Sequence, residues 1–434
     1  MAAKSTQDLH TAFELSIVVP FDVGRSYVFK PSHRSASDEK RDWDSLVSSA
    51  NQGPDSSTSW IWTTDRLGEA PAFYREPLGP VARCRLKSGT TPTLTELAEK
   101  SAFYSHFGAL EVVFFTRGIG VLLLRGTTRV VTAKDWRVIF HKDREHLKEA
   151  LLTTAGDRRR AYLRFMDIAA NKKRPIVFAI DLPNRRRELE KIRHPHVIAF
   201  TSEDVLPEEQ RHRASTLSFK VPVGYRYISG ETDLILAVDV GWGESTVYKT
   251  PPGSEDAQAA ITEAFVTAMA SWYSLVLMTS LVSNFLRNSF VDMANKKPRI
   301  SDRTGQTIRF MFMDTSTDSR PVRWAVRERD IILLDRIHTT WSTERWWRNV
   351  EERTTLLTAH HNEVAAGIRR QTDKRLGWLL IGLAAITSLS AVRDVADVWN
   401  PSHFRILFMM LLMLLVVVLL GLRLLREESD ELDE

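Results

Sequence analysis

Two uncharged apolar segments lie close together near the C-terminal end of the sequence. Leu376–Val392 (LGWLLIGLAAITSLSAV) and Ile406–Leu422 (ILFMMLLMLLVVVLLGL) each contain 17 residues without a charge. This is the shortest length at which a helix crosses about 30 Å of hydrocarbon. The 13 residues between them, RDVADVWNPSHFR, are too few to form a domain. The pattern therefore predicts a transmembrane hairpin over residues 376–422.

The basic residues around the two segments predict the orientation of this hairpin. Six of them flank it: Arg369, Arg370, Lys374, Arg375, Arg423 and Arg426. The connector has only two basic residues, together with Asp394 and Asp397. Because basic residues are retained on the cytoplasmic side, we expect both termini in the cytoplasm and the protein in the inner (plasma) membrane. A buried hairpin of a soluble protein is the alternative, but Ile406–Leu422 is apolar on all sides.

Composition limits what the remaining residues can be. The chain has 434 residues, a formal net charge of +5 and an acidic tail over residues 423–434. Its single cysteine, Cys84, excludes an intramolecular disulfide and is typical of a reducing compartment. We therefore expect everything before Leu376 to be a large cytoplasmic region.

Residues 1–250 contain apolar runs of strand length with amphipathic stretches among them. The expected strands are Ala12–Pro20, Trp60–Trp62, Val81–Leu86, Leu110–Phe115, Gly120–Leu124, Ile176–Ile180, Val197–Phe200 and Asp233–Val240. The expected helices are Leu94–Phe107, Asp135–Leu152 and Arg158–Ala170. Gly118 is expected in a hairpin turn, and the Ser- and Asp-rich residues 32–59 in a mobile insertion. The mixture predicts an α/β or α+β domain.

A third uncharged stretch, Ala264–Leu286, lies inside a helix predicted to run from after Ser254 to about Lys296. Its 23 residues are enough to cross a membrane. Seven of them are Ser, Thr or Asn, so the stretch is far more polar than the C-terminal segments. A single span here would also place residues 1–250 outside the cell. We therefore expect a buried cytoplasmic core helix, with a third span as the alternative.

From Val322 to about Lys374, apolar residues recur at helical spacing. They are Ile331, Leu334, Ile337, Trp341, Leu357, Val364 and Ile368. We expect one long helix with coiled-coil spacing, or two if Thr339-Thr340 interrupts it, leading directly into the first span. Residues 254–375 are therefore predicted to be a stalk or funnel of long helices.

The junction HNEVAAGIRRQTDKRLGWLLIGLAAITSLSAV, residues 361–392, joins polar heptads to a short membrane segment. An α/β region precedes this junction, and a short outer loop, a second span and a charged tail follow it. This organisation resembles the CorA family of magnesium channels, chiefly over Trp341–Glu434. The resemblance implies a homopentamer whose first spans line a central pore, with Mg²⁺ or another divalent cation as the transported ion. The family's Gly-Met-Asn signature is absent from the corresponding stretch, SLSAVRDVADVWNP.

Four polar residues share one face of a helix that continues past Val392. They are Thr387, Ser390, Asp394 and Asp397, at spacings of three, four and three. In a symmetric oligomer they would form hydroxyl rings capped by carboxylate rings, which concentrate cations at a pore mouth. Asn400 is the candidate contact of the outer loop with a hydrated ion. The alternative is a solvated loop in which Arg393 neutralises the two acids.

Other polar clusters have weaker functional interpretations. His360, His361 and Glu363 would offer metal ligands on one helix, although such exposed clusters are usually only polar. Three basic runs are Arg158–Arg160, Lys172–Arg174 and Arg185–Arg187. They would bind a nucleotide, a nucleic acid or anionic headgroups, but the acids interleaved among them favour a solvated surface. Asp239–Glu244 has two glycines after a strand without a nucleotide-binding pattern.

The sequence contains no constellation typical of an enzyme, and we predict no catalytic residues and no cofactor. Two functional classes remain. The first is a CorA-like homo-oligomeric channel or transporter for cations, in contact with the lipid bilayer. The second is a membrane-anchored sensor or effector, in which the cytoplasmic domain binds a ligand and the hairpin opens or perturbs the membrane.

Overall fold

The computed structural model describes part of the chain, and the chain divides into two units. The described residues are 11–29, 44–45, 47–48, 51, 60–63, 80–86, 95, 99, 107–115, 118–130, 144–171, 176–181, 195–201, 221–229, 232–248, 254–294, 330–397, 408 and 411. Unit 1 comprises residues 1–291 and 301–355, and unit 2 comprises residues 292–300 and 356–434.

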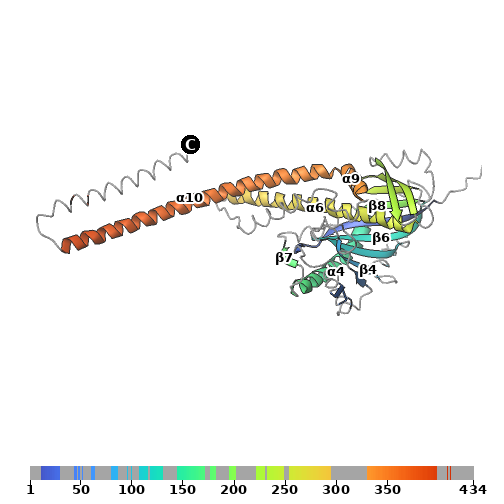
Figure 1. The fold of residues 1–434 in the computed structure, drawn as a ribbon, viewed down its shortest axis with the longest axis horizontal. Helices are drawn as coiled ribbons and strands as arrows, with labels where there is room; N and C mark the ends of the chain where they lie inside the picture. Colours follow the sequence, from blue (N-terminus) through green and yellow to red (C-terminus); the bar gives the residue numbers. More distant parts are fainter. Residues whose placement is uncertain are drawn as a thin grey trace, which may run out of the picture. The chain divides into compact units, whose positions relative to one another are not determined.

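Unit 1 is built on a mixed nine-stranded sheet (Figure 1). Its strands are β1 (Thr11–Asp22), β3 (Trp60–Thr63), β4 (Pro80–Leu86), β5 (Phe107–Phe115), β6 (Ile119–Val130), β8 (His196–Thr201), β9 (Val221–Ser229), β10 (Thr232–Val240) and β11 (Glu244–Tyr248). They are arranged in the order β3-β4-β5-β6-β1-β8-β11-β10-β9. Strands β8 and β11 are parallel, and the other neighbours are antiparallel. β2 (Arg25–Phe29) and β7 (Ile176–Asp181) pair in a separate two-stranded sheet. The expected α/β or α+β fold is confirmed.

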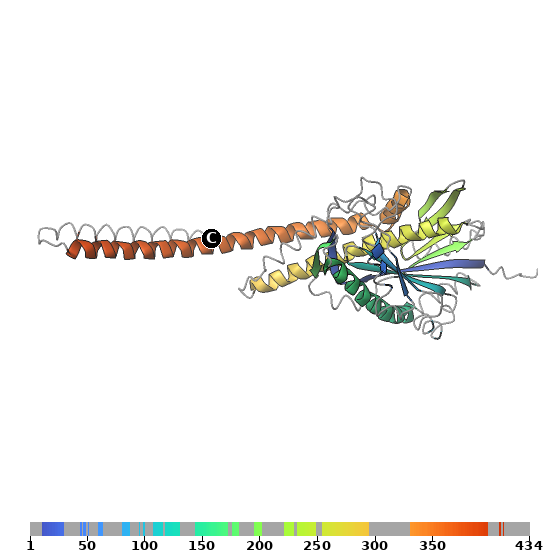
Figure 2. The same ribbon diagram turned by 60° about the horizontal axis from the view of Figure 1, so that its bottom comes forward.

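Helices cover both faces of the large sheet because its central strands are apolar on both faces. In β1, Leu15 and Ile17 belong to the core under α4 (Arg144–Asn171), whereas Val18 belongs to the core under α6 (Glu255–Ala294). Figures 1 and 2 show α4 on one side of the sheet and α6 on the other. β1 has a strand on each side and a helix over each face, so it lies at the centre of unit 1.

The predicted core helix after Ser254 is α6, and it is buried. Among the described residues, Glu255–Asn284 is the one helical stretch long and apolar enough to cross a membrane, and 89% of its apolar window is buried inside the protein. Apolar side chains such as Phe265 and Tyr273 pack in the core between α6 and the sheet. The burial agrees with a core helix and not with the alternative of a third span.

Two further helices follow, so of the two alternatives left open by the sequence, two helices rather than one long helix are found. α9 (Asp330–Thr340) ends one residue before Trp341, and α10 (Thr343–Asp397) begins after Ser342, whose φ is +52°. The Thr343 hydroxyl donates to the carbonyl of His338 at 2.7 Å. α10 continues without a break through the first predicted span and past Val392.

Other boundaries predicted from the sequence need correction. The helices expected over 135–152 and 158–170 are one helix, α4, because Leu151 and Tyr162 pack on the same sheet face and Gly156 between them remains helical. Phe107, predicted to end a helix, begins β5 and is buried in the sheet core. The hairpin β5–β6 is confirmed, with Gly118 at φ +70° in its turn.

Some predicted features lie outside the described residues, wholly or in large part. They are most of the insertion 32–59, most of the helix 94–106, residues 135–143, the loop that contains Asn400, and the second span apart from residues 408 and 411. The predicted domain boundaries and the hairpin itself therefore stay predictions.

Candidate functional site

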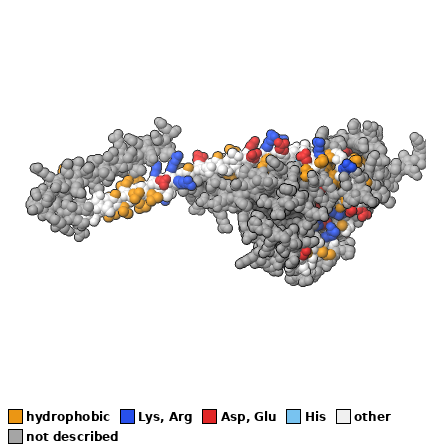
Figure 3. All heavy atoms as spheres, viewed as in Figure 1, with side chains coloured by type: hydrophobic (Ala, Val, Ile, Leu, Met, Phe, Trp, Pro, Cys, Tyr) orange, Lys and Arg blue, Asp and Glu red, His pale blue; other side chains and the backbone are white. Residues whose placement is uncertain are grey.

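The last described part of α10 exposes large apolar side chains. Leu379, Leu380, Leu383 and Ile386 are between 63% and 69% exposed, and Trp378 is 51% exposed. At 100° per residue these side chains, with Leu376, cover roughly 200° of the helix circumference. In Figure 3, hydrophobic side chains gather along this part of α10, after a stretch with mixed charges. Such a surface is unfavourable in water and requires an apolar environment or a partner.

The predicted pore face lies on this same helix. Thr387 and Ser390 are exposed, and the Thr387 hydroxyl donates to the carbonyls of Leu383 and Ala384, both at 3.0 Å. Back-bonding of this kind satisfies a hydroxyl within its own helix, so that it is tolerated in an apolar environment. Asp394 and Asp397 belong to the described helix, so all four predicted residues share one continuous helical face.

A cluster of ion pairs lies on the face of the sheet that α6 covers. Arg83 donates to Glu111 at 2.7 Å and forms a two-fold interaction with Glu263 of α6, at 2.6 and 2.7 Å. Arg85 and Arg125 approach the Glu111 carboxylate at 3.6 and 3.7 Å. The Glu111 side chain is only 5% exposed. Its buried charge is therefore balanced by bases from the two strands on either side of β5, which are β4 and β6.

Sequence reasoning missed this cluster, although β4 contained a signal for it. Arg83 and Arg85 alternate with the buried residues Ala82 and Cys84, which is typical of a strand with charged side chains on one face. The pairing with Glu111 could not be inferred, because it depends on the register of β4 and β5.

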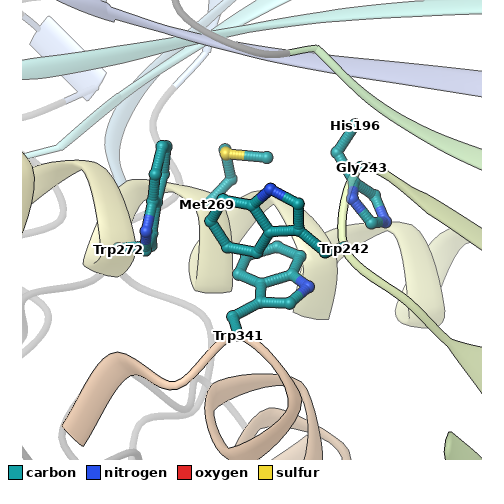
Figure 4. Close-up of a pocket in the computed structure, with 6 residues that line it drawn as sticks. All are labelled: His196, Trp242, Gly243, Met269, Trp272 and Trp341. Atoms are coloured by element: carbon teal, nitrogen blue, oxygen red, sulfur yellow. The ribbon is translucent and has the colours of Figure 1, made fainter. Parts of the chain in front are cut away.

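An aromatic cluster lies where the turn between β10 and β11 meets α6 and the α9–α10 junction (Figure 4). The space among its residues is about 230 Å³, including the part open to solvent, and it is lined by His196, Trp242, Gly243, Met269, Trp272 and Trp341. The Trp242 ring lies 5.0 Å from that of Trp272 and 5.7 Å from that of Trp341. Rings at these separations are in contact, so no ligand fits between them as they stand.

This cluster attaches the α9–α10 junction to the sheet. The Trp341 indole N–H donates to the carbonyl of Gly241 at 2.9 Å, and its ring lies 5.0 Å from the His196 ring. His196 Nε2 and the Ser245 hydroxyl are 3.1 Å apart. Gly243, at φ +82°, closes the turn that positions Trp242. The two glycines of Asp239–Glu244 therefore have structural roles: Gly243 allows the tight turn, and the carbonyl of Gly241 accepts a hydrogen bond from the Trp341 indole.

The first predicted basic run, Arg158–Arg160, has structural partners within unit 1. Arg158 lies over the Trp60 ring at 4.8 Å, and Arg160 is hydrogen-bonded to Asp157. Arg159 donates to the carbonyl of Val23 at 2.6 Å, and partial burial lowers the pKa of its guanidinium. These contacts favour the structural interpretation of this run. The other two runs lie outside the described residues.

The remaining candidates have no specific geometry. The structure forms no cluster of three or more His, Cys, Asp or Glu residues suited to a metal among the residues it describes. His360 is half-buried and Glu363 is exposed on α10. Cys84 is fully buried, and burial raises the pKa of its thiol to about 12, so it is unreactive in the folded protein.

His338 of α9 is expected to make the protein less stable in acid. Burial lowers the pKa of its imidazole from 6.5 to about 4, and Nε2 has no hydrogen-bond partner among the described residues. The unfolded chain therefore binds the proton more readily than the folded protein. Stability that is present above pH 6.5 is lost as the pH falls toward about 4, by on the order of 3 kcal/mol.

The measurement is chemical denaturation of the full-length protein at several pH values. His338→Leu should remove this part of the acid dependence, whereas a replacement of the half-buried His360 by Leu should leave it unchanged. An acid dependence that is identical in the wild type and in His338→Leu would contradict the assignment.

No protein-family model matches the sequence, and no curated protein matches it.

Proposed function

We propose that the chain is the protomer of a CorA-like homo-oligomeric membrane channel or transporter for cations. In this proposal α10 enters the lipid bilayer near Leu376, and both termini remain in the cytoplasm. The observation that carries it is the exposed apolar surface of one helix that begins in unit 1 and continues into unit 2.

The energetics favour a bilayer as the environment of this helix. Transfer of a Leu or Ile side chain from water to an apolar phase contributes about 1.5–3 kcal/mol. The exposed side chains are spread around much of the helix circumference. This distribution suits contact with lipid or with several helices, whereas a single partner helix would need only one narrow apolar stripe. Arg369, Arg370 and Arg375 are exposed just before the apolar part, where basic residues favour the cytoplasmic interface.

The proposed cation path is the face with Thr387, Ser390, Asp394 and Asp397. In an oligomer around a central axis, each residue would form a ring, and the two carboxylate rings would attract cations. Asn400 of the outer loop is the proposed contact for a hydrated divalent ion such as Mg²⁺. A pentamer is proposed from the resemblance to the CorA family.

A membrane-anchored sensor or effector is the second candidate. Unit 1 has a groove of about 950 Å³, including the part open to solvent, with polar and apolar side chains in its lining. It is large enough for a small molecule. In this function ligand binding to unit 1 would act on the membrane segment through α10. The mass of the detergent-solubilised protein distinguishes the two: a closed oligomer supports the channel, and a monomer supports the sensor.

The orientation of the hairpin can be tested by cysteine labelling. A cysteine at Ser402 should react with a membrane-impermeant reagent in intact cells, and one at Ser429 should react only after the cells are opened. The native thiol of Cys84 gives little background because it is fully buried and its pKa is raised to about 12. Labelling at Ser429 in intact cells, or protection at Ser402, would show that the proposed topology is wrong.

A further inference from the structure

The groove in unit 1 lies on the sheet face that α6 covers, at the end where β1 begins. Its polar lining is contributed by two strands and by the first turns of α6: Glu14, Ser16, Arg125, Thr127, Glu255 and Gln258. Strands β1 and β6 contribute through neighbouring positions, because Ser16 is directly opposite Arg125 and Glu14 is opposite Thr127. The groove is therefore formed by rigid elements.

A β-bulge in β5 widens the sheet at this point. Phe107 pairs with Gly126 and Ala109 pairs with Arg125, so Gly108 is the extra residue of the bulge. A Cβ atom added at Gly108 would meet no atom within 4 Å. Bulges are frequent next to binding sites because they redirect the adjacent side chains. Here the bulge leaves open space at Gly108, which lines the same groove as Arg125.

The Arg125 guanidinium has unused hydrogen-bonding capacity. Its Nη2 is 3.7 Å from Glu111 Oε2, which is too long for a hydrogen bond, and Glu111 is already bound by Arg83 at 2.7 Å. Arg125 Nε is buried without a hydrogen-bond partner among the described residues. An unpaired buried donor is unfavourable, and a guanidinium is suited to bind a carboxylate through two parallel hydrogen bonds. The arrangement favours an anionic group of a ligand.

Two exposed carboxylates line the same groove. Glu14 is two positions from Ser16, so it is a diagonal cross-strand neighbour of Arg125, at roughly 7–8 Å by the geometry of antiparallel strands. Glu255 lies in the first turn of α6. A simple anion would be repelled by both carboxylates, and a simple cation would be repelled by Arg125. A ligand with both charges is complementary to the whole lining.

We propose that this groove binds a small zwitterion of the α-amino acid class. The carboxylate of the ligand binds the Arg125 guanidinium, and its ammonium group lies between Glu14 and Glu255. The proposal does not depend on ion conduction, and it supplies a ligand class for unit 1 whichever function the membrane segment has.

The test uses the full-length protein in detergent, with the common L-amino acids as individual probes. Binding is measured by the shift of the thermal unfolding midpoint and then by calorimetric titration of the best probe. At least one amino acid is expected to bind. Two derivatives of this amino acid serve as comparisons: its amide, which lacks the carboxylate, and its N-acetyl form, which lacks the ammonium group. The affinity for each should be lower by at least about tenfold, because each loses a charged interaction.

Three variants test the site itself. Arg125→Met and Glu14→Gln should each weaken binding by about tenfold. Gly108→Leu should block the groove while leaving the ion pairs of Glu111 intact. It therefore tests the site even if Arg125→Met lowers the stability of the protein. Arg348→Met, on the exposed surface of α10, is the matched control and should bind like the wild type.

Any of three results would overturn the proposal. The first is that no amino acid binds. The second is that binding is unchanged in Arg125→Met, Glu14→Gln and Gly108→Leu. The third is that inorganic phosphate binds as tightly as the best amino acid, which would indicate a site for anions alone.

Discussion

Replacement of Thr387 by Leu is expected to reduce cation flux to near background while the oligomer stays assembled. In the proposed pore, the hydroxyl rings of Thr387 keep water in the path, and a ring of leucines would narrow and dry it. The added side chain has room in the protomer because Thr387 is exposed and bonds only to its own helix. The measurement is flux in liposomes, with the oligomer mass determined on the same preparation.

The matched control is Ser388→Leu, one residue further and 100° around the helix, which should conduct like the wild type. Asp394→Asn should reduce flux less than Thr387→Leu does, and most strongly at low ionic strength, where screening is weakest. If Thr387→Leu and Asp394→Asn both conduct like the wild type, these residues do not line a pore. If the wild type itself conducts no cation, the sensor or effector function is favoured.

Replacement of Arg83 by Met is expected to lower the free energy of unfolding by about 3–5 kcal/mol, since removal of one partner leaves a buried charge poorly compensated. Arg83 binds both Glu111 and Glu263, and the side chains of Arg83 and Glu111 are 10% and 5% exposed. Arg85 and Arg125 are too distant from Glu111 to replace the lost hydrogen bond. The measurement is chemical denaturation of the full-length protein followed by tryptophan fluorescence.

A second substitution distinguishes a charge effect from a packing effect. Adding Glu111→Met to Arg83→Met removes the uncompensated buried carboxylate and should recover much of the lost stability. Arg348→Met breaks the exposed pair with Glu344 and should change stability little, because solvent screens that pair. A loss below about 1 kcal/mol for Arg83→Met would mean that the neighbouring bases compensate Glu111.

Sequence patterns correctly predicted the elements that depend mainly on interactions between residues close together in the sequence. The apolar core of β1, the β5–β6 hairpin around Gly118 and the start of α6 after Ser254 are all recognisable in the sequence. A break at Thr339-Thr340 was one of two alternatives, and the sequence did not show its cause, which is the anchoring of Trp341 to the turn between β10 and β11. That contact joins residues 100 positions apart.

The misjudged elements depend on tertiary contacts. Strands β9 and β11 were missed because they are stabilised by their neighbours in the sheet. Helix α4 was predicted as two helices, 135–152 and 158–170, because packing on the sheet is invisible in a local pattern. The groove was not predictable for the same reason. It is assembled from β1, β5, β6, β8 and α6, and only the sheet order brings Glu14, Arg125 and Glu255 together.

The position of β1 between β6 and β8 has a consequence for synthesis on the ribosome. β1 is made first, but its partners are residues 119–130 and 196–201. At translation rates of about 5–20 residues per second, β1 waits roughly 10–40 s for its second neighbour. During that time a strand with apolar side chains on both faces lacks a partner on at least one edge, and it is prone to aggregate. Chaperone binding to the nascent chain should therefore be strongest before residue 201 emerges, well before the apolar part of α10 is made.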